Sequence, residues 1–348
     1  MDKKPQGAGP ESPERAHRAS VLEDWLHSLR ARWVRRLGHR AHVVPFSGYG
    51  TTTEVRVLCR VLLLKPRTTV GGTLRRVRGW RSFLGVPVVG ARVNVSLGGH
   101  TVVMIADRGG VVDDVAAISL TPGWSTATLV AEKCEPVEAQ IFVVAPEVKT
   151  GIVCDVDDTI MVTALPRPFL AAWNSFVRDE HARRPVPGMA VLLERLTQAH
   201  PDAPVIYLST GAWNVAPTLH RFLTRHLYPR GAFLLTDWGP THDRWFRSGR
   251  EHKRRSLARL AVEFPHIRWI LIGDDGQHDE ALYGEFAMAH PDNVAAIAIR
   301  ELRAPEALLA GGRRHLDRTH NPITIPWVSA PNGSGLAAEL KKLGVLHR

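Results

Sequence analysis

The sequence predicts an α/β protein with two folded parts: an antiparallel β-sandwich over residues 41–146 and a doubly wound, Rossmann-like parallel sheet over residues 147–305. Short strand-like runs separated by turn residues dominate the first part, whereas apolar strands alternate with helical stretches in the second. A length of 348 residues accommodates two domains of ordinary size.

The first part carries strand-like runs with turn signals between them. These runs are 55–63, 91–97, 101–105 and 126–130, with Gly98 and Gly99 among the turn residues. Such spacing is typical of an antiparallel sandwich. The runs contain no constellation of catalytic groups, so we expect the chemistry to lie in the second part.

The second part alternates apolar strands with helices. The predicted strands are 151–154, 204–209, 232–236, 268–273 and 294–299, and the helices between them are 188–199, 215–227, 251–263 and 278–290. Alternation of this kind indicates a parallel sheet. Ligands of such sheets bind beyond the carboxyl ends of the strands, so those ends are where functional residues are expected.

Three segments flank the two domains. Residues 1–18 are predicted to be a disordered tail, and residues 306–348 a basic C-terminal extension. Residues 19–40 are predicted to form an amphipathic helix, with apolar side chains on one face: Leu22, Trp25, Leu26, Leu29, Trp33 and Leu37. Two interpretations stay open, because such a helix either lies on an anionic membrane or packs on its own domain.

The composition favours an anionic partner. The net charge is +11, which suits a phosphorylated substrate, an anionic membrane or a nucleic acid, although a high-GC genome enriched in Arg codons is an alternative cause. We expect the first two partners rather than a nucleic acid. The cysteines are Cys59, Cys134 and Cys154, whose spacing indicates neither zinc nor a disulfide framework. Without a secretory signal or a membrane-spanning run, the expected location is the cytoplasm, with peripheral membrane contact.

An acidic cluster follows the first strand of the second part. Ile152, Val153 and Cys154 run directly into Asp155, Asp157, Asp158 and Thr159. Carboxylates at the end of a buried strand repel one another and resist desolvation unless a cation lies among them. A Mg²⁺ ion with a bound phosphate is one explanation, and a fortuitous acidic turn is the other.

Other strand ends carry matching groups. The second strand ends in Ser209 and Thr210, and the fourth in Asp274 and Asp275, with Asp279 following. Lys253 lies near the start of a predicted helix. Hydroxyls, a lysine and two carboxylate pairs together form a set that suits a phosphoryl group and Mg²⁺.

These motifs, taken in order, resemble those of the haloacid dehalogenase-like phosphatases. Asp155, Asp157 and Thr159 match the first motif, Ser209 the second, Lys253 the third, and Gly273-Asp-Asp275 the fourth. A narrower resemblance links the chain to the family of the yeast actin-patch phosphatidate phosphatase. It is carried by Phe46-Ser-Gly-Tyr-Gly-Thr51, Pro185-Val-Pro-Gly-Met189, Arg247-Ser-Gly-Arg-Glu-His-Lys253 and Gly273-Asp-Asp-Gly-Gln-His-Asp279. Two positions depart: no Pro follows Ser209 shortly, and Asp275 stands where that family usually has Ser.

The resemblance implies a role for each matched residue. Asp155 is then the nucleophile that forms an aspartyl-phosphate, and Asp157 is the general acid and base. Thr159, Ser209, Thr210 and Lys253 hold the phosphate, with Thr210 the rival of Ser209 for one position. Mg²⁺ is held by Asp155, Asp157 (through its backbone carbonyl), Asp274 and Asp275. Segment 161–187 takes the place of a small cap, because it is too short for a large one.

The resulting prediction is a Mg²⁺-dependent phosphatase, with phosphatidate or a related lipid phosphate as the substrate that the resemblance implies. Two rivals stay open at this point. One is a phosphatase of a soluble phosphoester or phosphoprotein, and the other is a basic module that binds membranes or nucleic acid without catalysis. The intact set of Asp, Ser and Lys residues favours an enzyme.

Overall fold

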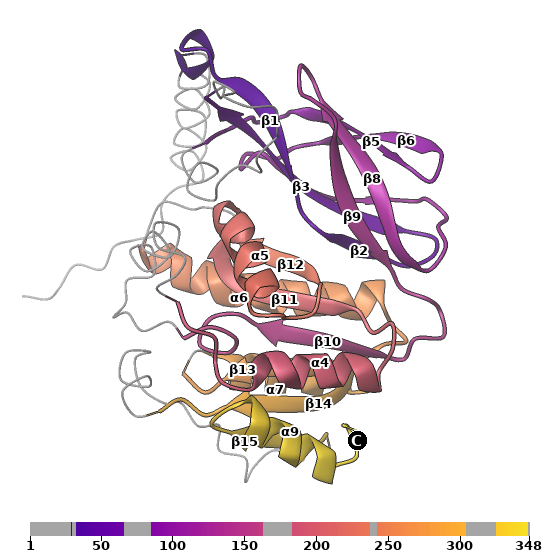
Figure 1. Cartoon of the computed structure of the whole chain (residues 1–348), viewed down its shortest axis with the longest axis vertical. Helices are drawn as coiled ribbons and strands as arrows, with labels where there is room; N and C mark the ends of the chain where they lie inside the picture. The colour runs from indigo at the N-terminus through magenta and orange to yellow at the C-terminus, as the bar shows by residue number, and fades with distance from the viewer. Residues whose placement is uncertain are drawn as a thin grey trace, which may run out of the picture.

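The computed structural model describes residues 29, 33–65, 85–162, 183–236, 242–276, 278–303 and 325–346, with the backbone alone described for 242–248. It contains a β domain and an α/β domain that pack against each other (Figure 1). The predicted tail 1–18, most of the helix 19–40 and most of the cap segment 161–187 lie outside the described residues.

The β domain is built on one mixed sheet. Its strands are β1 (Arg40–Pro45), β2 (Gly48–Gly50), β3 (Val55–Leu64), β4 (Val86–Pro87), β5 (Arg92–Leu97), β6 (His100–Ile105), β7 (Val111–Ala116), β8 (Gly123–Ala131) and β9 (Val137–Val143). The order is β1-β3-β2-β9-β8-β5-β6, and β4 and β7 also pair with β3. β1 packs against β8 and β9 without pairing with them, so the sheet folds over its own core.

The prediction of a purely antiparallel sandwich is wrong in one pairing. β2 pairs parallel with β9, while the other pairings within this sheet are antiparallel among the residues described. β2 is only three residues long, from Gly48 to Gly50, which is too short to show a strand period in the sequence. The four predicted runs lie in β3, β5, β6 and β8.

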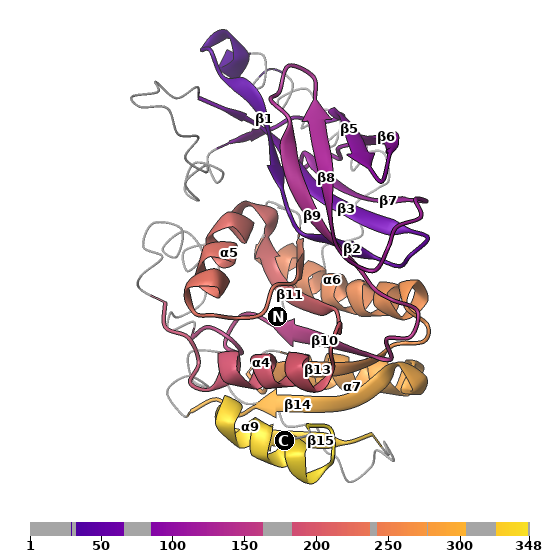
Figure 2. The same cartoon turned by 45° about the vertical axis from the view of Figure 1, so that its right-hand side comes forward.

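The α/β domain has a parallel sheet, as predicted. Its strands are β10 (Thr150–Asp155), β11 (Val205–Ala212), β12 (Ala232–Thr236), β13 (Arg268–Asp274), β14 (Val294–Arg300) and β15 (Trp327–Ala330). The order is β12-β11-β10-β13-β14-β15, and every pairing is parallel. Helices α4 (Met189–Ala199) and α9 (Gly333–Lys342) lie on one side of the sheet, and α6 (His242–Glu263) and α7 (Asp279–Ala289) on the other (Figure 2). Helix α5 (Ala216–Arg225) follows β11 through the short helix η1 (Trp213–Val215), and η2 (Pro291–Asn293) precedes β14.

The C-terminal segment contributes more than the basic extension expected over 306–348. β15 pairs with β14 at the edge of the sheet, and α9 packs against α4. Asn332 caps α9 by accepting a hydrogen bond from the backbone N–H of Gly335 at 2.9 Å. The sequence did not indicate β15 because the strand has only four residues and a proline on each side, Pro326 and Pro331.

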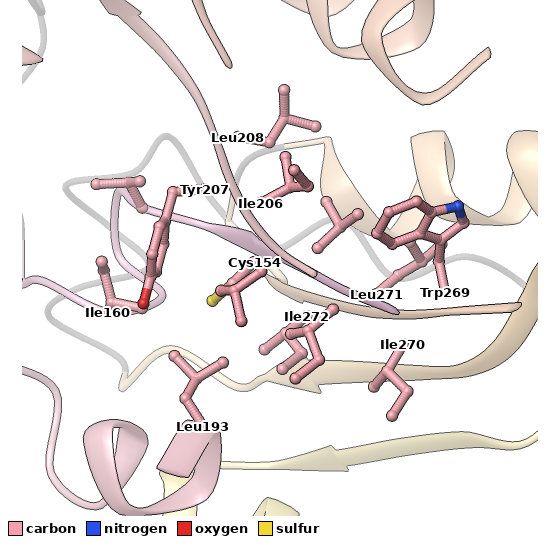
Figure 3. Packing of buried hydrophobic residues seen from close by; sticks show 14 of the residues in the cluster. Cys154, Ile160, Leu193, Ile206, Tyr207, Leu208, Trp269, Ile270, Leu271 and Ile272 are labelled. Carbon is pink, nitrogen blue, oxygen red and sulfur yellow. The ribbon is translucent and has the colours of Figure 1, made fainter. Parts of the chain in front are cut away.

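The central strands form the core of the α/β domain. Ile152, Val153 and Cys154 of β10 are fully buried, as are Trp269 and Tyr207 on the neighbouring strands. Figure 3 shows Cys154, Tyr207 and Trp269 among the buried side chains that pack around these strands. Burial on both faces explains why the strands read as continuous apolar runs. The same core extends into the β domain through Phe46, Tyr49, Leu58, Val111 and Val144.

A short helical piece precedes β1. Val34 is buried against Leu63 and Val86 of the β domain. The three described residues of the predicted stripe, Leu29, Trp33 and Leu37, do not share this burial and are 38%, 64% and 52% exposed. Within the described part of the chain, no helix is long and apolar enough to cross a membrane.

Candidate active site

The candidate site lies where the strand order of the α/β sheet reverses. β10 leads outward through β11 to β12, and the chain then crosses to β13 on the other side of β10. In parallel sheets this switch point leaves a crevice at the carboxyl ends of the two central strands. β10 ends at Asp155 and β13 ends at Asp274, so both predicted carboxylates project from this point.

Lys253 lies between two carboxylates at this edge. Its Nζ donates to Asp155 Oδ1 and to Asp279 Oδ1, each at 2.6 Å. All three side chains are at most 3% exposed. Burial alone would lower the pKa of Lys253, but the charges of Asp155 and Asp279 and their hydrogen bonds raise it above the usual range. The lysine is therefore a fixed cation beside the predicted nucleophile.

Asp157 and Ser209 form the second contact of the site. Ser209 Oγ donates to Asp157 Oδ2 at 3.1 Å and accepts from the backbone N–H of Gly211 at 2.9 Å. Burial is the main cause that raises the pKa of Asp157 to about 6, and the charge of Asp158 adds to it, while Arg183, Ser209 and Lys253 oppose the shift. The structure thus joins the loop after β10 to the end of β11.

The two carboxylates of the second acidic pair, Asp274 and Asp275, make different contacts. Asp274 Oδ1 accepts from the backbone N–H of Gly276 at 2.7 Å and faces the site. Asp275 instead accepts from the backbone N–H of Leu302 at 2.8 Å, so its carboxylate ties the end of β13 to the end of β14. Its place beside Asp274 in the sequence did not reveal this, because adjacent residues at a strand end point to opposite faces.

The two predicted threonines differ in their surroundings. Thr159 is fully buried, and its Oγ1 has no hydrogen-bond partner among the described residues. Thr210 lies beside α6, where a Cβ placed on Gly249 would come within 3.0 Å of Thr210 Cγ2. Gly249 therefore lets α6, the helix that carries Lys253, pack closely on the end of β11.

A divalent cation fits the carboxylates at the crevice. Asp155, Asp274 and Asp279 offer oxygen atoms that lie within 4.8 Å of one another, all from buried side chains. Among the described residues, Asp155 Oδ2 has no hydrogen-bond partner although it is buried, and burial raises the pKa of Asp155 and of Asp274 well above the ordinary value. Buried oxygens that repel one another are the donor set that a hard cation such as Mg²⁺ prefers. Asp275, which was predicted as a ligand, is not part of this group, and Asp157 was predicted to offer only its backbone carbonyl.

Two residues of the site were not among the predicted site residues. Asp279 begins α7, and its Oδ2 lies 3.4 Å from the backbone nitrogen of Asp274, which donates to it. Its position in the first turn after a strand was a usable signal, because a carboxylate there also interacts favourably with the helix dipole. Arg183 is buried near Asp157 and Asp158, whose charges act on it. It stands in an arginine-rich run, so the sequence did not distinguish it.

A family model matches the segment that carries this site. Residues 150–301 match the catalytic domain of phosphatidate phosphatase APP1. The predicted resemblance to the phosphatidate phosphatase family is therefore confirmed for this segment, and the motif Phe46–Thr51 lies outside it.

Two curated proteins match the same part of the chain. Phosphatidate phosphatase APP1 of Saccharomyces cerevisiae is 26% identical over 151 residues, which cover 43% of this chain and 25% of that protein. An uncharacterized protein of Schizosaccharomyces pombe is 24% identical over 153 residues, which cover 44% of this chain and 25% of that protein. The chain thus matches about a quarter of the length of these relatives.

Among solved structures, a carbohydrate acetylesterase from Xanthomonas citri aligns with 73% of this chain and 66% of its own at 8% identity. The TM-score of 0.27 is too low for this likeness to bear on fold or function.

Proposed function

We propose that this protein is a Mg²⁺-dependent phosphatase that hydrolyses phosphatidate, or a related lipid phosphate, through an aspartyl-phosphate on Asp155. The observation that supports it most is the convergence of Lys253, Asp155 and Asp279 at the switch point of a parallel sheet. The strand order and the helices on both sides also support a doubly wound, haloacid dehalogenase-like fold. The family match of residues 150–301 supports the choice of substrate.

In this proposal, Asp155 and Lys253 carry the first step. Asp155 Oδ2, which makes no hydrogen bond, attacks phosphorus while Oδ1 stays bound to Lys253. Lys253 keeps the nucleophile ionised and faces charge that develops on the phosphate oxygens. Ser209 lies within hydrogen-bond distance of Asp157 and holds another oxygen of the same phosphate.

Asp157 moves the protons in both half-reactions. It donates a proton to the leaving oxygen of the lipid, and the bond between phosphorus and that oxygen breaks as the bond to Asp155 forms. It then takes a proton from the water that attacks phosphorus, which releases inorganic phosphate and restores the Asp155 carboxylate. Mg²⁺, held by Asp155, Asp274 and Asp279, would neutralise charge on the phosphate.

The exposed helical stripe supports contact with a membrane in which a lipid substrate resides. Leu29, Trp33 and Leu37 recur at four-residue intervals on one helical face and are exposed, and Arg35 and Arg36 beside them are exposed too. Two interpretations were left open for residues 19–40. These three side chains are exposed and so do not pack on the protein's own domain. An apolar stripe flanked by cations suits the surface of an anionic bilayer. We propose a cytoplasmic protein that binds such a surface peripherally.

Phosphate release tests the catalytic proposal. Wild type and Asp155→Asn are assayed on phosphatidate in mixed micelles with Mg²⁺, with p-nitrophenyl phosphate alongside. Asp292→Asn is the matched control, because Asp292 is exposed and lies in η2 just before β14, at the opposite end of the strands from the site. We expect release from phosphatidate that only Asp155→Asn abolishes.

The assay also distinguishes the rival functions. Release from p-nitrophenyl phosphate alone would retain the mechanism and replace the lipid by a soluble phosphoester or phosphoprotein. Full activity of Asp155→Asn would overturn the proposed nucleophile. No phosphate release from either substrate would favour a binding module without catalysis.

Vesicle binding tests the membrane contact separately. Trp33→Ser is expected to reduce co-sedimentation with vesicles that contain phosphatidylglycerol, which is anionic but not a substrate. Val191→Ser is the control, because Val191 is 62% exposed on α4 and outside the stripe. Equal loss in both variants, or none in either, would contradict the assigned surface.

A further inference from the structure

The residues of the candidate site are held in place by two different parts of the structure. Asp155 and Asp274 end β10 and β13, the central strands, each of which pairs with strands on both sides. Ser209 and Lys253, which we propose as phosphate-binding groups, come from the end of β11 and from helix α6. The β domain contacts α6, the short helix η1 that directly follows β11, and the edge strand β12.

Glu263, at the end of α6, is bound by two residues of the β domain. Arg56 of β3 donates to Glu263 Oε1 from Nε at 2.9 Å and from Nη2 at 2.5 Å. Tyr49 of β2 donates from its hydroxyl to Glu263 Oε2 at 3.0 Å. Both oxygens of one carboxylate are therefore fixed by side chains from another domain, in a geometry that holds position as well as distance.

Asp113 of β7 extends this network back to α6. Its Oδ1 accepts from Arg56 Nη1 at 2.6 Å, and its Oδ2 accepts from Arg259 Nη1 of α6 at 2.9 Å. Although burial alone would raise the pKa of Asp113, the charges of Arg259 and Arg56 lower it below its ordinary value. The chain Glu263–Arg56–Asp113–Arg259 thus starts and ends on the same helix.

The β domain also packs on the segment that follows Ser209. The ring of Phe46 stacks on Trp213 at 4.7 Å between centroids and 22° between planes. Trp213 begins η1, directly after β11 loses its regular register with β12 between Leu208 and Ala212. The irregular segment that contains Ser209 is therefore held at its far end by an aromatic residue of the β domain.

These directional contacts fix the position of α6, which apolar packing on the sheet alone does not. Leu257 and Leu260 bury one face of α6, but hydrophobic contact is non-directional and permits sliding. Lys253 is ten residues before Glu263, which is about 15 Å along a stiff helix. A small tilt or slide at Glu263 is accordingly transmitted to the ammonium group of Lys253.

We propose that Tyr49, Arg56, Asp113 and Phe46 of the β domain are positioning residues for the phosphate-binding half of the site. They act through Glu263 and Arg259 on Lys253 and through Trp213 on Ser209. The β domain is then part of the catalytic unit and not a separable binding module. This inference rests on the proposed function, since it assigns Lys253 and Ser209 to phosphate binding.

The test uses the full chain with Asp113→Asn, Phe46→Leu and Tyr49→Phe. Arg254→Met is the matched control, because Arg254 is also on α6 and forms ion pairs, but with Glu251 and Glu285 of its own domain. The readouts are the inhibition constant of inorganic phosphate, kcat and KM on p-nitrophenyl phosphate, and hydrogen exchange of the amides of residues 249–257.

We expect Asp113→Asn and Phe46→Leu to raise the inhibition constant of phosphate by about tenfold, since small misplacements of binding groups cost that much or more. Tyr49→Phe should give a smaller rise, and Arg254→Met a change of less than about twofold. Asp113→Glu, which keeps the charge, should recover part of the loss. Amides of 249–257 should exchange faster in Asp113→Asn but not in the control.

A purely structural role predicts a different pattern. Fewer active molecules would lower kcat while leaving KM and the inhibition constant unchanged. The proposal is overturned if phosphate inhibition and amide exchange stay at wild-type values in both Asp113→Asn and Phe46→Leu. If Asp113→Asn does not fold, Tyr49→Phe, which removes a single hydroxyl, takes its place. Wild-type phosphate inhibition and amide exchange in that variant would then overturn the proposal. If wild type hydrolyses no substrate, the phosphatase proposal fails, but amide exchange still tests whether the β domain positions α6. The failure of one proposal can therefore be told from the failure of the other.

Discussion

The carboxylate half of the site and its phosphate-binding half are built in different ways. Asp155 and Asp274 sit at the ends of neighbouring strands, so the pairing of β10 with β13 brings them together without further help. Lys253 instead lies on α6, which the β domain holds through contacts of Arg56 and Tyr49 with Glu263, and Ser209 lies in the segment whose far end, Trp213, stacks on Phe46. The first half is a consequence of sheet topology, and the second depends on a domain interface.

This difference predicts where substitutions act. Changes in the carboxylate half should alter metal binding and chemistry within the α/β domain alone. Changes in the interface should alter phosphate affinity from a distance, with the carboxylates left in place.

Lys253→Met should have the largest effect, because it touches both halves. It removes the cation between Asp155 and Asp279, and breaking a buried ion pair costs about 3–5 kcal/mol. We expect phosphatase activity to fall to background and the melting temperature to fall, with part of the latter restored by Mg²⁺. Calorimetry with and without Mg²⁺ measures this.

The control for this prediction is Lys342→Met. Lys342 pairs with Glu339 on the surface of α9 and is 69% exposed, so its replacement should change neither the phosphatase activity nor the melting temperature. A Lys253→Met protein that melts like wild type in the absence of Mg²⁺ would contradict the arrangement of the three buried charges.

Gly273→Ala should disturb the carboxylate half alone. A Cβ at Gly273 would lie 2.7 Å from the Cβ of Asp279 and 2.8 Å from the ring of Tyr283, so both side chains must shift. Overpacking of this kind typically costs about 1–3 kcal/mol of unfolding free energy. Urea unfolding and titration with Mg²⁺ should show lower stability and weaker metal binding. Wild-type Mg²⁺ affinity in a destabilised protein would show that Asp279 is not a ligand.

The interface should weaken in acid. The folded pKa of Asp113 lies below its ordinary value of 3.8, so the ion pairs stabilise the protein fully above that value and are lost as the pH falls through the folded pKa. Asp113→Asn lacks this contribution at every pH. The difference in melting temperature between wild type and Asp113→Asn should therefore shrink below about pH 4. A difference that grows in acid would contradict the sign of this shift.

Thr159→Val should have the smallest effect on folding. Thr159 Oγ1 is buried without a hydrogen bond, and Val has nearly the same shape, so the unfolding free energy should change by less than about 1 kcal/mol. If the hydroxyl binds phosphate, the inhibition constant of phosphate should rise in the same variant. Loss of stability by several kcal/mol would show that the hydroxyl has a structural partner.

The same contrast explains how much the sequence predicted. The strands β10 to β14 and the approach of Asp155, Asp157, Ser209 and Asp274 followed from apolar periodicity and from the rule that parallel strands end at one edge, whereas Lys253, on a helix, was selected by its motif. Each of these side chains lies next to its own strand or helix signal. The structure brings them together as that rule requires.

Other features depended on contacts that no local pattern encodes. β2, three residues long, pairs parallel with β9, and β15 joins the sheet from a segment predicted as an extension. Asp275 turned toward Leu302 because the end of β14 offers a backbone donor there, whereas Asp279 reached the site from the first turn of α7. The network of Arg56, Asp113 and Glu263 joins residues that only the packed domains bring together.

The central claim is that Asp155 becomes covalently phosphorylated. The most direct measurement is acid-quenched mass spectrometry of the full chain after mixing with phosphatidate micelles and Mg²⁺, with peptide mapping of residues 150–162. We predict a transient phosphoryl group on Asp155 that is absent in Asp155→Asn. Steady phosphate release with no phosphoryl group on Asp155 at any time, or the group on another residue, would contradict the account.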